Sequence, residues 1–182
     1  MDRELVERAR GGDRDAFTVL VHHVSDRLYA VAHRILRDSD LADDALQNAL
    51  VTVWRQLPSL RDAERFEAWS QRILVHACYA ESRRRTGWAA TVRVIPVAPS
   101  TPDTSTALAD RDEIEQAFRR LSPEHRAVFV LHHYLGVPLV EVAATLGIPA
   151  GTARSRLHNA SRALRAAIEG GAQPAIEGVR QV

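Results

Sequence analysis

The chain has 182 residues and a formal net charge of +1 at pH 7, which suits one large domain or two small ones. No apolar run approaches the roughly 18 to 20 residues of a membrane-spanning helix, and the charged first residues are unlike a targeting segment. We therefore expect a soluble cytoplasmic protein. The single cysteine, Cys78, excludes a disulfide framework and a cysteine-based zinc site within this chain.

All 24 basic residues are arginine, because the sequence contains no lysine. A GC-rich genome is the simplest explanation for this bias. Arginine is nevertheless the side chain best suited to bidentate contacts with phosphate and guanine. The position of the arginines must therefore show whether they bind nucleic acid.

Apolar residues spaced by three and four predict helices throughout the first half of the chain. One helix is expected at 15–36. A second is expected at about 41–57, with Ser39 or Asp40 as its N-cap. A third is expected at 66–85, and it ends in three consecutive arginines.

The composition changes at 88–109, where proline, serine and threonine replace the helical pattern and predict a flexible linker. Helices resume after it, and Ser122, followed by a proline, is the expected N-cap of one of them. The glycine-containing end, 170–182, is expected to be disordered. The sequence thus predicts an all-α chain with two small helical domains, 1–87 and 110–169.

The second domain contains a helix-turn-helix pattern. A short helix is expected at 138–146, a tight turn at 147–151, and a long helix from Thr152 to Ile168 that contains no acidic residue. A recognition helix inserts its N-terminal residues into the major groove of DNA. The expected DNA contacts of this helix are Thr152, Arg154, Ser155, Arg156, His158, Arg162 and Arg165.

Within this helix we expect two kinds of contact. Arg154, Ser155 and His158 lie near the N-terminus and are candidates for base edges. The remaining arginines are expected to hold phosphates, which positions the protein without reading sequence. The alternative is an ordinary solvated basic helix.

Several motifs resemble one known family. Residues 147–157 (GIPAGTARSRL) look like the signature of domain 4 of extracytoplasmic-function sigma factors, and 121–128 (LSPEHRAV) resembles its lead-in. The first half is similar to domain 2 of the same family at 12–17, 42–54 and 66–73. Two motif sets in the correct order are more specific than a helix-turn-helix alone.

The resemblance implies a division of roles. Domain 2 is expected to dock on the β′ coiled coil of core RNA polymerase and to open promoter DNA at the −10 element. Domain 4 is expected to read the −35 element and to contact the β flap. The implied polymerase-binding residues are Asp43, Asp44, Gln47, Asn48 and Trp54. For the aspartates, stabilisation of the helix N-terminus is an equal alternative.

The resemblance also implies a −10 site around the loop from 59 to 65, because a melted base needs a pocket that stacks and hydrogen-bonds it. Core packing is the alternative for the two aromatic residues next to this loop. The implied −10 residues are Arg61, Asp62, Arg65, Phe66, Trp69, Arg72, His76, Arg83 and Arg84.

Three positions depart from the family pattern. His76 stands where asparagine is common, and Ala80 stands where an aspartate is expected, so the −10 preference is open. Asn48 stands where an acid is usual, which could alter how tightly polymerase is held. His76 could also be a helical histidine without a DNA contact.

No catalytic motif, cofactor or metal site is expected. The adjacent histidine pairs at 22–23 and 132–133 point to different helix faces, so each pair does not converge on one ion. One alternative is a dimeric helix-turn-helix regulator that acts without polymerase, and another is a helical interaction protein with a vestigial DNA-binding helix. By resemblance, an anti-sigma protein is a further expected partner.

Overall fold

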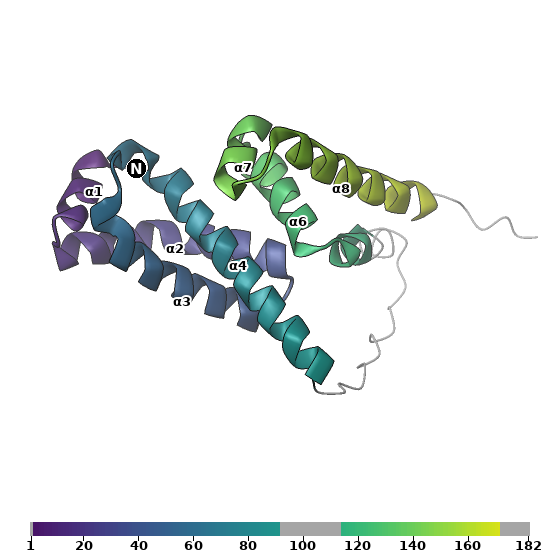
Figure 1. Cartoon of the computed structure of the whole chain (residues 1–182), viewed down its shortest axis with the longest axis horizontal. Helices are drawn as coiled ribbons and strands as arrows, with labels where there is room; N and C mark the ends of the chain where they lie inside the picture. Colours follow the sequence, from purple (N-terminus) through teal and green to yellow (C-terminus); the bar gives the residue numbers. More distant parts are fainter. Residues whose placement is uncertain (1, 92–113, 172–182) are drawn as a thin grey trace, which may run out of the picture.

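The computed structural model describes residues 2–91 and 114–171, and every described element is helical. Figure 1 shows one group of helices on each side of the long helix α4. The N-terminal domain contains α1 (Arg3–Arg10), α2 (Arg14–Leu36), α3 (Ser39–Gln56), η1 (Leu57–Ser59), η2 (Ala63–Arg65) and α4 (Phe66–Thr91). The C-terminal domain contains the helical residues 114–120, α6 (Pro123–Phe129), η3 (Val130–Tyr134), α7 (Leu139–Leu146) and α8 (Ala150–Gly171).

Capping side chains explain where several helices begin. The Ser122 hydroxyl accepts a hydrogen bond from the backbone N–H of His125, which confirms Ser122 as the N-cap of α6. The predicted cap of α3 was wrong by one or two positions. Asp38 caps that helix by accepting from the N–H of Leu41 at 3.1 Å, because its backbone is extended whereas the next residue is already helical.

Two helices are longer than predicted. Helix α4 continues through Thr91, so the first four residues of the expected 88–109 linker are helical, and the rest of that linker lies outside the described residues. A single glycine inside a helical pattern is tolerated, and the alanines that follow favour helix. Helix α8 begins at Ala150, two residues before Thr152, and it ends at Gly171. The remainder of the predicted tail also lies outside the described residues.

The core is continuous across the two domains. On the N-terminal side it contains fully buried residues of α2 and α4 such as Leu20 and Leu74. On the C-terminal side Val128, Leu131 and Val142 belong to the same cluster of buried residues. Helix α4 contacts both α6 and α7, and α2 contacts α6. Figure 1 shows α6 and α7 on the other side of α4 from α1 and α3. The sequence predicted two domains but not that they would pack together.

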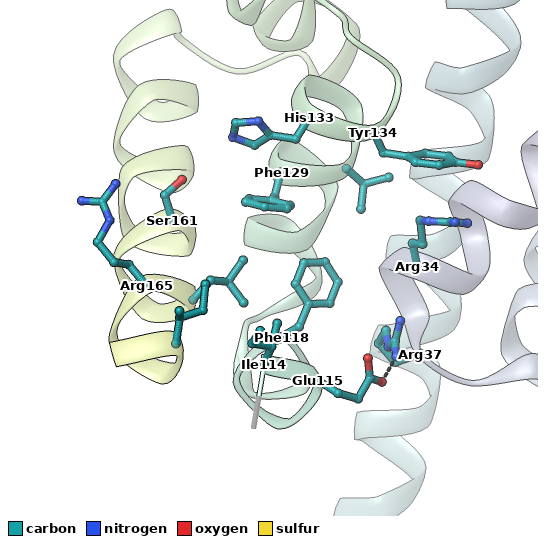
Figure 2. A pocket seen from close by; sticks show the side chains of 13 residues that line it. Arg34, Arg37, Ile114, Glu115, Phe118, Phe129, His133, Tyr134, Ser161 and Arg165 are labelled. Carbon is teal, nitrogen blue, oxygen red and sulfur yellow. Dashed lines mark ion pairs between the residues drawn. The ribbon is translucent and has the colours of Figure 1, made fainter. Parts of the chain in front are cut away.

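Charged side chains also join the domains. At the end of α2, Arg37 forms an ion pair with Glu115 of the C-terminal domain. The guanidinium of Arg34 lies 3.8 Å from the ring centre of Tyr134. Figure 2 shows these pairs at the edge of a mostly apolar hollow of about 590 Å³ between the domains. Glu115 also pairs with Arg119 at 3.2 Å, so this one acid balances two arginines.

Buried charge at this junction is only partly compensated. Arg126 is 7% exposed, and its Nε atom has no hydrogen-bond partner among the described residues. Burial lowers the pKa of Arg126 to about 10, with a further contribution from the positive charge of Arg37. The pKa of Arg37 is lowered in the same way, by burial and by its arginine neighbours. The contact between the domains therefore combines an apolar core with costly positive charge.

Candidate nucleic-acid and polymerase interfaces

The helix-turn-helix is formed by α7 and α8. Gly147 ends α7 with a φ of 66°, and its N–H and that of Ile148 bond to carbonyl groups of the last turn. A Cβ added to Gly147 would meet no atom within 4 Å, so the backbone angle rather than space requires glycine there. Ile148 packs on the core. This turn therefore sets the angle between α7 and α8.

Helix α8 has a buried edge and an exposed basic face. Ala153, Ala160 and Leu164 are buried as predicted, and Leu157 is partly buried. Among the described residues, the exposed arginines of this helix form no ion pair. The exposed members of the predicted set are Arg154, Ser155, His158, Arg162 and Arg165, and Thr152 is partly buried.

Arg156 differs from the other arginines of α8 because it is partly buried beside the other domain. Its positive charge acts on Glu124 of α6 and on Tyr79 of α4. Burial raises the pKa of Tyr79 to about 12, and the charge of Arg156 opposes that rise. In this arrangement Arg156 thus faces the domain junction rather than the open side of α8.

The loop 59–65, where the −10 site is predicted, forms one wall of a hollow of about 340 Å³, called the −10 loop hollow below. Asp62 caps η2 by accepting from the N–H of Glu64 at 3.0 Å, and the Arg65 Nε lies 3.5 Å from its other oxygen. Thr145 of α7 lines the hollow from the other domain. The residues of the predicted −10 site that it brings together are Arg61, Asp62, Arg65, Trp69 and Arg72.

Phe66 does not belong to this surface, which corrects its predicted contact with DNA. Its side chain is 1% exposed and is one of the largest fully buried groups. The ring lies 6.0 Å from the Trp69 ring, measured between centroids. Phe66 begins α4 and points into the core, because the polar residues around it take the solvent positions of η2 and the first turn. Phe66 therefore packs against Trp69 from the core side.

The arginines near 83–85 are not equivalent. Arg84 bridges Asp44 of α3 at 3.3 Å and Glu81 at 3.0 Å, and Arg85 pairs with Asp38. Arg83 is exposed and forms no ion pair within the described part of the chain. Arg84 thus connects α4 to α3, whereas Arg83 is available to an external anion.

The five predicted polymerase-binding residues of α3 lie on two different stripes. Asp43, Gln47 and Trp54 lie on the outer face, and the Trp54 ring packs 4.6 Å from the ring of Phe17 between centroids. Val51, 49% exposed, shares this face and was not predicted. An exposed valine inside an otherwise polar stripe was the available signal.

The second stripe faces α4. Asp44 pairs with Arg84, and the side-chain amide of Asn48 donates to Glu81 at 3.0 Å. Glu81 is 5% exposed. Positions four apart lie one above another on a helix, so this stripe continues to Thr52 and Gln56. The sequence interpretation assigned Asp44 and Asn48 to polymerase because it could not tell which stripe faced the neighbouring helix.

A third hollow lies between these two helices. It has a volume of about 550 Å³. All three positions that depart from the family pattern line it: Asn48, His76 and Ala80. Trp69 and Arg72 line both this hollow and the −10 loop hollow. The two hollows are therefore neighbours that share a wall.

In the described part of the chain, no helix is long and apolar enough to span a membrane. No group of three or more potential metal ligands comes together within those same residues. The surfaces that remain are a basic recognition helix and two hollows beside exposed arginines. A basic helix within a helix-turn-helix is typical of a DNA-binding protein.

Comparison with known proteins agrees with this description. Residues 20–87 match the family model Sigma-70 region 2, and residues 111–164 match Sigma-70, region 4. The chain is thus built as a sigma factor of bacterial RNA polymerase. It is 35% identical over 157 residues to the ECF RNA polymerase sigma factor SigM of Mycobacterium tuberculosis, covering 85% of this chain and 78% of that one. This chain belongs to the extracytoplasmic-function sigma factor family.

More distant relatives cover nearly the whole chain. The ECF sigma factor SigW of Bacillus subtilis is 24% identical over 178 residues, with 91% of this chain and 95% of that one covered. Among solved structures, CnrH in complex with the cytosolic domain of CnrY has a TM-score of 0.66 at 24% identity, covering 93% of this chain and 97% of that one. The sigma factor RpoE of Bartonella quintana, in complex with the anti-sigma factor NepR, also has a TM-score of 0.66, at 23% identity and 84% and 96% coverage. These two likenesses show the fold.

As a member of this family, the chain binds core RNA polymerase and promoter DNA and directs promoter-specific transcription initiation. The dimeric regulator that acts without polymerase is not favoured, because the first half matches Sigma-70 region 2. Sigma factors regulate transcription and are not catalysts.

Proposed function

We propose that α8 reads the −35 element, with Arg154, Ser155 and His158 at base edges. The observation that supports this most directly is the exposed basic face of α8 between Thr152 and Ile168, a stretch that contains no acidic residue. The three proposed base-contacting residues lie near the N-terminus of α8, the part of a recognition helix that enters the major groove. The remaining predicted contacts hold phosphates or position the helix: Thr152, Arg156, Arg162 and Arg165.

The −10 element binds the N-terminal domain. A melted base enters the hollow of Arg61, Asp62 and Arg65, where Trp69 offers a stacking surface. Arg72 and Arg83 contact the backbone, and His76 lies next to the strand. Arg84 contributes mainly by holding α3 against α4, since it already has two acidic partners.

Core polymerase binds the outer face of α3. Asp43, Gln47 and Trp54 form that face with Val51, so the contact with the β′ coiled coil combines charge with an apolar centre. Asp44 and Asn48 act indirectly by fixing α3 on α4. The C-terminal domain contacts the β flap. Polymerase supplies the chemistry, and the chain works in the cytoplasm where polymerase and promoter are found.

These roles require the domains to separate. The −35 and −10 elements lie about 25 base pairs apart, which is about 85 Å at 3.4 Å per base pair. In the structure α4 contacts α7, and Thr145 lines the −10 loop hollow. One chain cannot occupy both elements in this arrangement. The linker proposed at 88–109, between domains 1–87 and 110–169, must then span the difference with the part that follows the end of α4 at Thr91.

An anti-sigma protein is a further proposed partner. CnrH and the Bartonella quintana RpoE were each solved with a bound protein, CnrY for the first and the anti-sigma factor NepR for the second. In this chain the exposed Val51 and Trp54 offer an apolar surface that such a partner could cover.

The decisive experiment is reconstituted transcription with core polymerase and a genomic promoter library. We expect specific initiation. Failure to bind core or to direct initiation would refute the function itself.

Single variants then test the roles within α8. Arg154→Ala is expected to relax the preference at one −35 base, whereas Arg156→Ala should weaken binding about equally across sequences. Equal loss in both variants, without any altered preference, would refute this division. Glu169→Gln, a change on the same helix outside the proposed contacts, is the matched control.

A further inference from the structure

The hollow between α3 and α4 has no assigned occupant. It is about 550 Å³, a size typical of small-molecule sites, and it is lined by residues of the N-terminal domain alone. It therefore remains lined in the same way if the C-terminal domain moves away. Three residues of α3 line it at a spacing of four: Asn48, Thr52 and Gln56.

One end of the hollow is closed by internal bonds. Asn48 donates to Glu81 at 3.0 Å, and the Thr52 hydroxyl donates to the carbonyl oxygen of Asn48 at 2.8 Å. Glu81 also lies 3.0 Å from the Arg84 guanidinium. These groups have their partners inside the domain, so they form the floor and the end of the hollow rather than its reading surface.

The other end is different. Gln56, Arg72 and His76 are exposed side chains that line the hollow, and none of them forms a side-chain hydrogen bond or ion pair within the described residues. Trp69, partly buried, provides an aromatic wall beside them. Convergent free polar groups next to an aromatic surface are suited to an unstacked nucleobase.

We propose that a second base of the opened −10 strand enters this hollow, that the base is an adenine, and that Gln56 reads it. This inference rests on the proposed function of the neighbouring loop hollow. A carboxamide offers one donor and one acceptor, which match the N6 amino group and N7 of adenine. Arg72, which lines both hollows, holds the phosphate between the two bases.

The proposal divides α3 into two working stripes. The outer stripe with Gln47 and Trp54 faces polymerase, and the inner stripe ends at Gln56 on the DNA. Base choice at the −10 element then depends on both helices of the hollow. His76 of α4 lines the same hollow as Gln56 of α3.

The test uses holoenzyme reconstituted from core polymerase and the full chain. Its binding to bubble-containing promoter fragments is measured with each of the four bases at every position of the −10 element. Gln56→Ala is expected to lower the preference for adenine at one position about tenfold and to leave the other positions unchanged. Gln56→Glu should shift that position toward cytosine, whose N4 amino group pairs with a carboxylate. Arg55→Ala, at the exposed neighbouring residue outside the hollow, should retain the wild-type preference.

Unchanged base preference at every position in both Gln56 variants would overturn the inference, as would an equal loss of binding to all fragments. Core affinity, measured separately by titration, should be the same in Gln56→Ala and wild type, and a loss there would assign Gln56 to polymerase instead. If the wild-type holoenzyme initiates while the Gln56 variants behave normally, the inference alone fails. If the wild-type chain does not initiate, the proposed function fails and the inference fails with it.

Discussion

The ion pair between Arg37 and Glu115 offers a direct way to shift the balance between packed and separated domains. Replacing Glu115 by glutamine keeps the shape of the side chain and removes its charge. In the packed state the Arg37 side chain, which is 19% exposed, would then lose its acidic partner. It would still lie beside the positive charges of Arg34 and Arg119. We expect Glu115→Gln to favour the separated state.

The magnitude follows from the exposure of the pair. A hydrogen bond to a charged group contributes about 1.5–3 kcal/mol when it is well shielded, and exposed pairs contribute about 0–1 kcal/mol. Glu115 is 34% exposed, so about 1.5 kcal/mol is a reasonable value, or roughly a tenfold change in the equilibrium. Glu115 also accepts from Arg119 of its own helix at 3.2 Å, but that bond exists in both states and cancels.

The assay is energy transfer between dyes on cysteines introduced at Thr18 of α2 and Ala166 of α8, both exposed positions. Cys78 can stay, because it is 0% exposed. The ratio of the low-transfer to the high-transfer population should rise about tenfold in Glu115→Gln, and it should also rise in wild type as salt screens the pair. Glu4→Gln, the same charge change on the distant exposed helix α1, should have no effect. Identical distributions for Glu115→Gln and wild type would refute the reasoning.

Three further predictions concern stability. Gly147→Ala should cost about 1–2 kcal/mol, because φ is 66° there, and should lower the thermal midpoint, whereas Gly151→Ala inside α8 should not. Phe66→Ala should cost about 3–5 kcal/mol in urea unfolding, and a cost below 1 kcal/mol would contradict its place in the core. Burial raises the pKa of Cys78 from 9.0 to about 12, so folding stability should fall as pH rises from about 9 toward 12, since only the unfolded thiol ionises there. Burial also raises the pKa of Tyr79 to about 12, which adds to the same slope. Cys78→Ala should therefore reduce the slope without removing it, and an unchanged slope would contradict this assignment.

The sequence predicted those parts of the fold that depend on local signals. The apolar stripe of α2 and the Ser122 cap involve residues three or four positions apart, so their physics can be read along the chain. The turn at Gly147 is of the same kind. The α3 cap moved to Asp38 because residues 38–40 are all polar and able to cap, and the backbone conformation selects among them.

The orientation of side chains between elements could not be predicted in this way. Arg156 and Arg162 are both arginines of one basic helix, but Arg156 is partly buried near Glu124 of α6 and Tyr79 of α4, whereas Arg162 is exposed. Phe66 was adjacent in sequence to a surface loop, yet its ring points inward. Such facts depend on contacts between residues far apart in the chain, which no local pattern contains.

The pairing of Asn48 with Glu81 gives one departure from the family pattern a physical cause. Glu81 is 5% exposed, and Asn48 donates to it at 3.0 Å. An acid at position 48 would place a second carboxylate against this buried one, and like charges at such a distance are strongly unfavourable. An amide both avoids the repulsion and satisfies an oxygen of Glu81. Asn48 is thus explained by the contact between α3 and α4, and a weaker hold on polymerase is not needed to account for it.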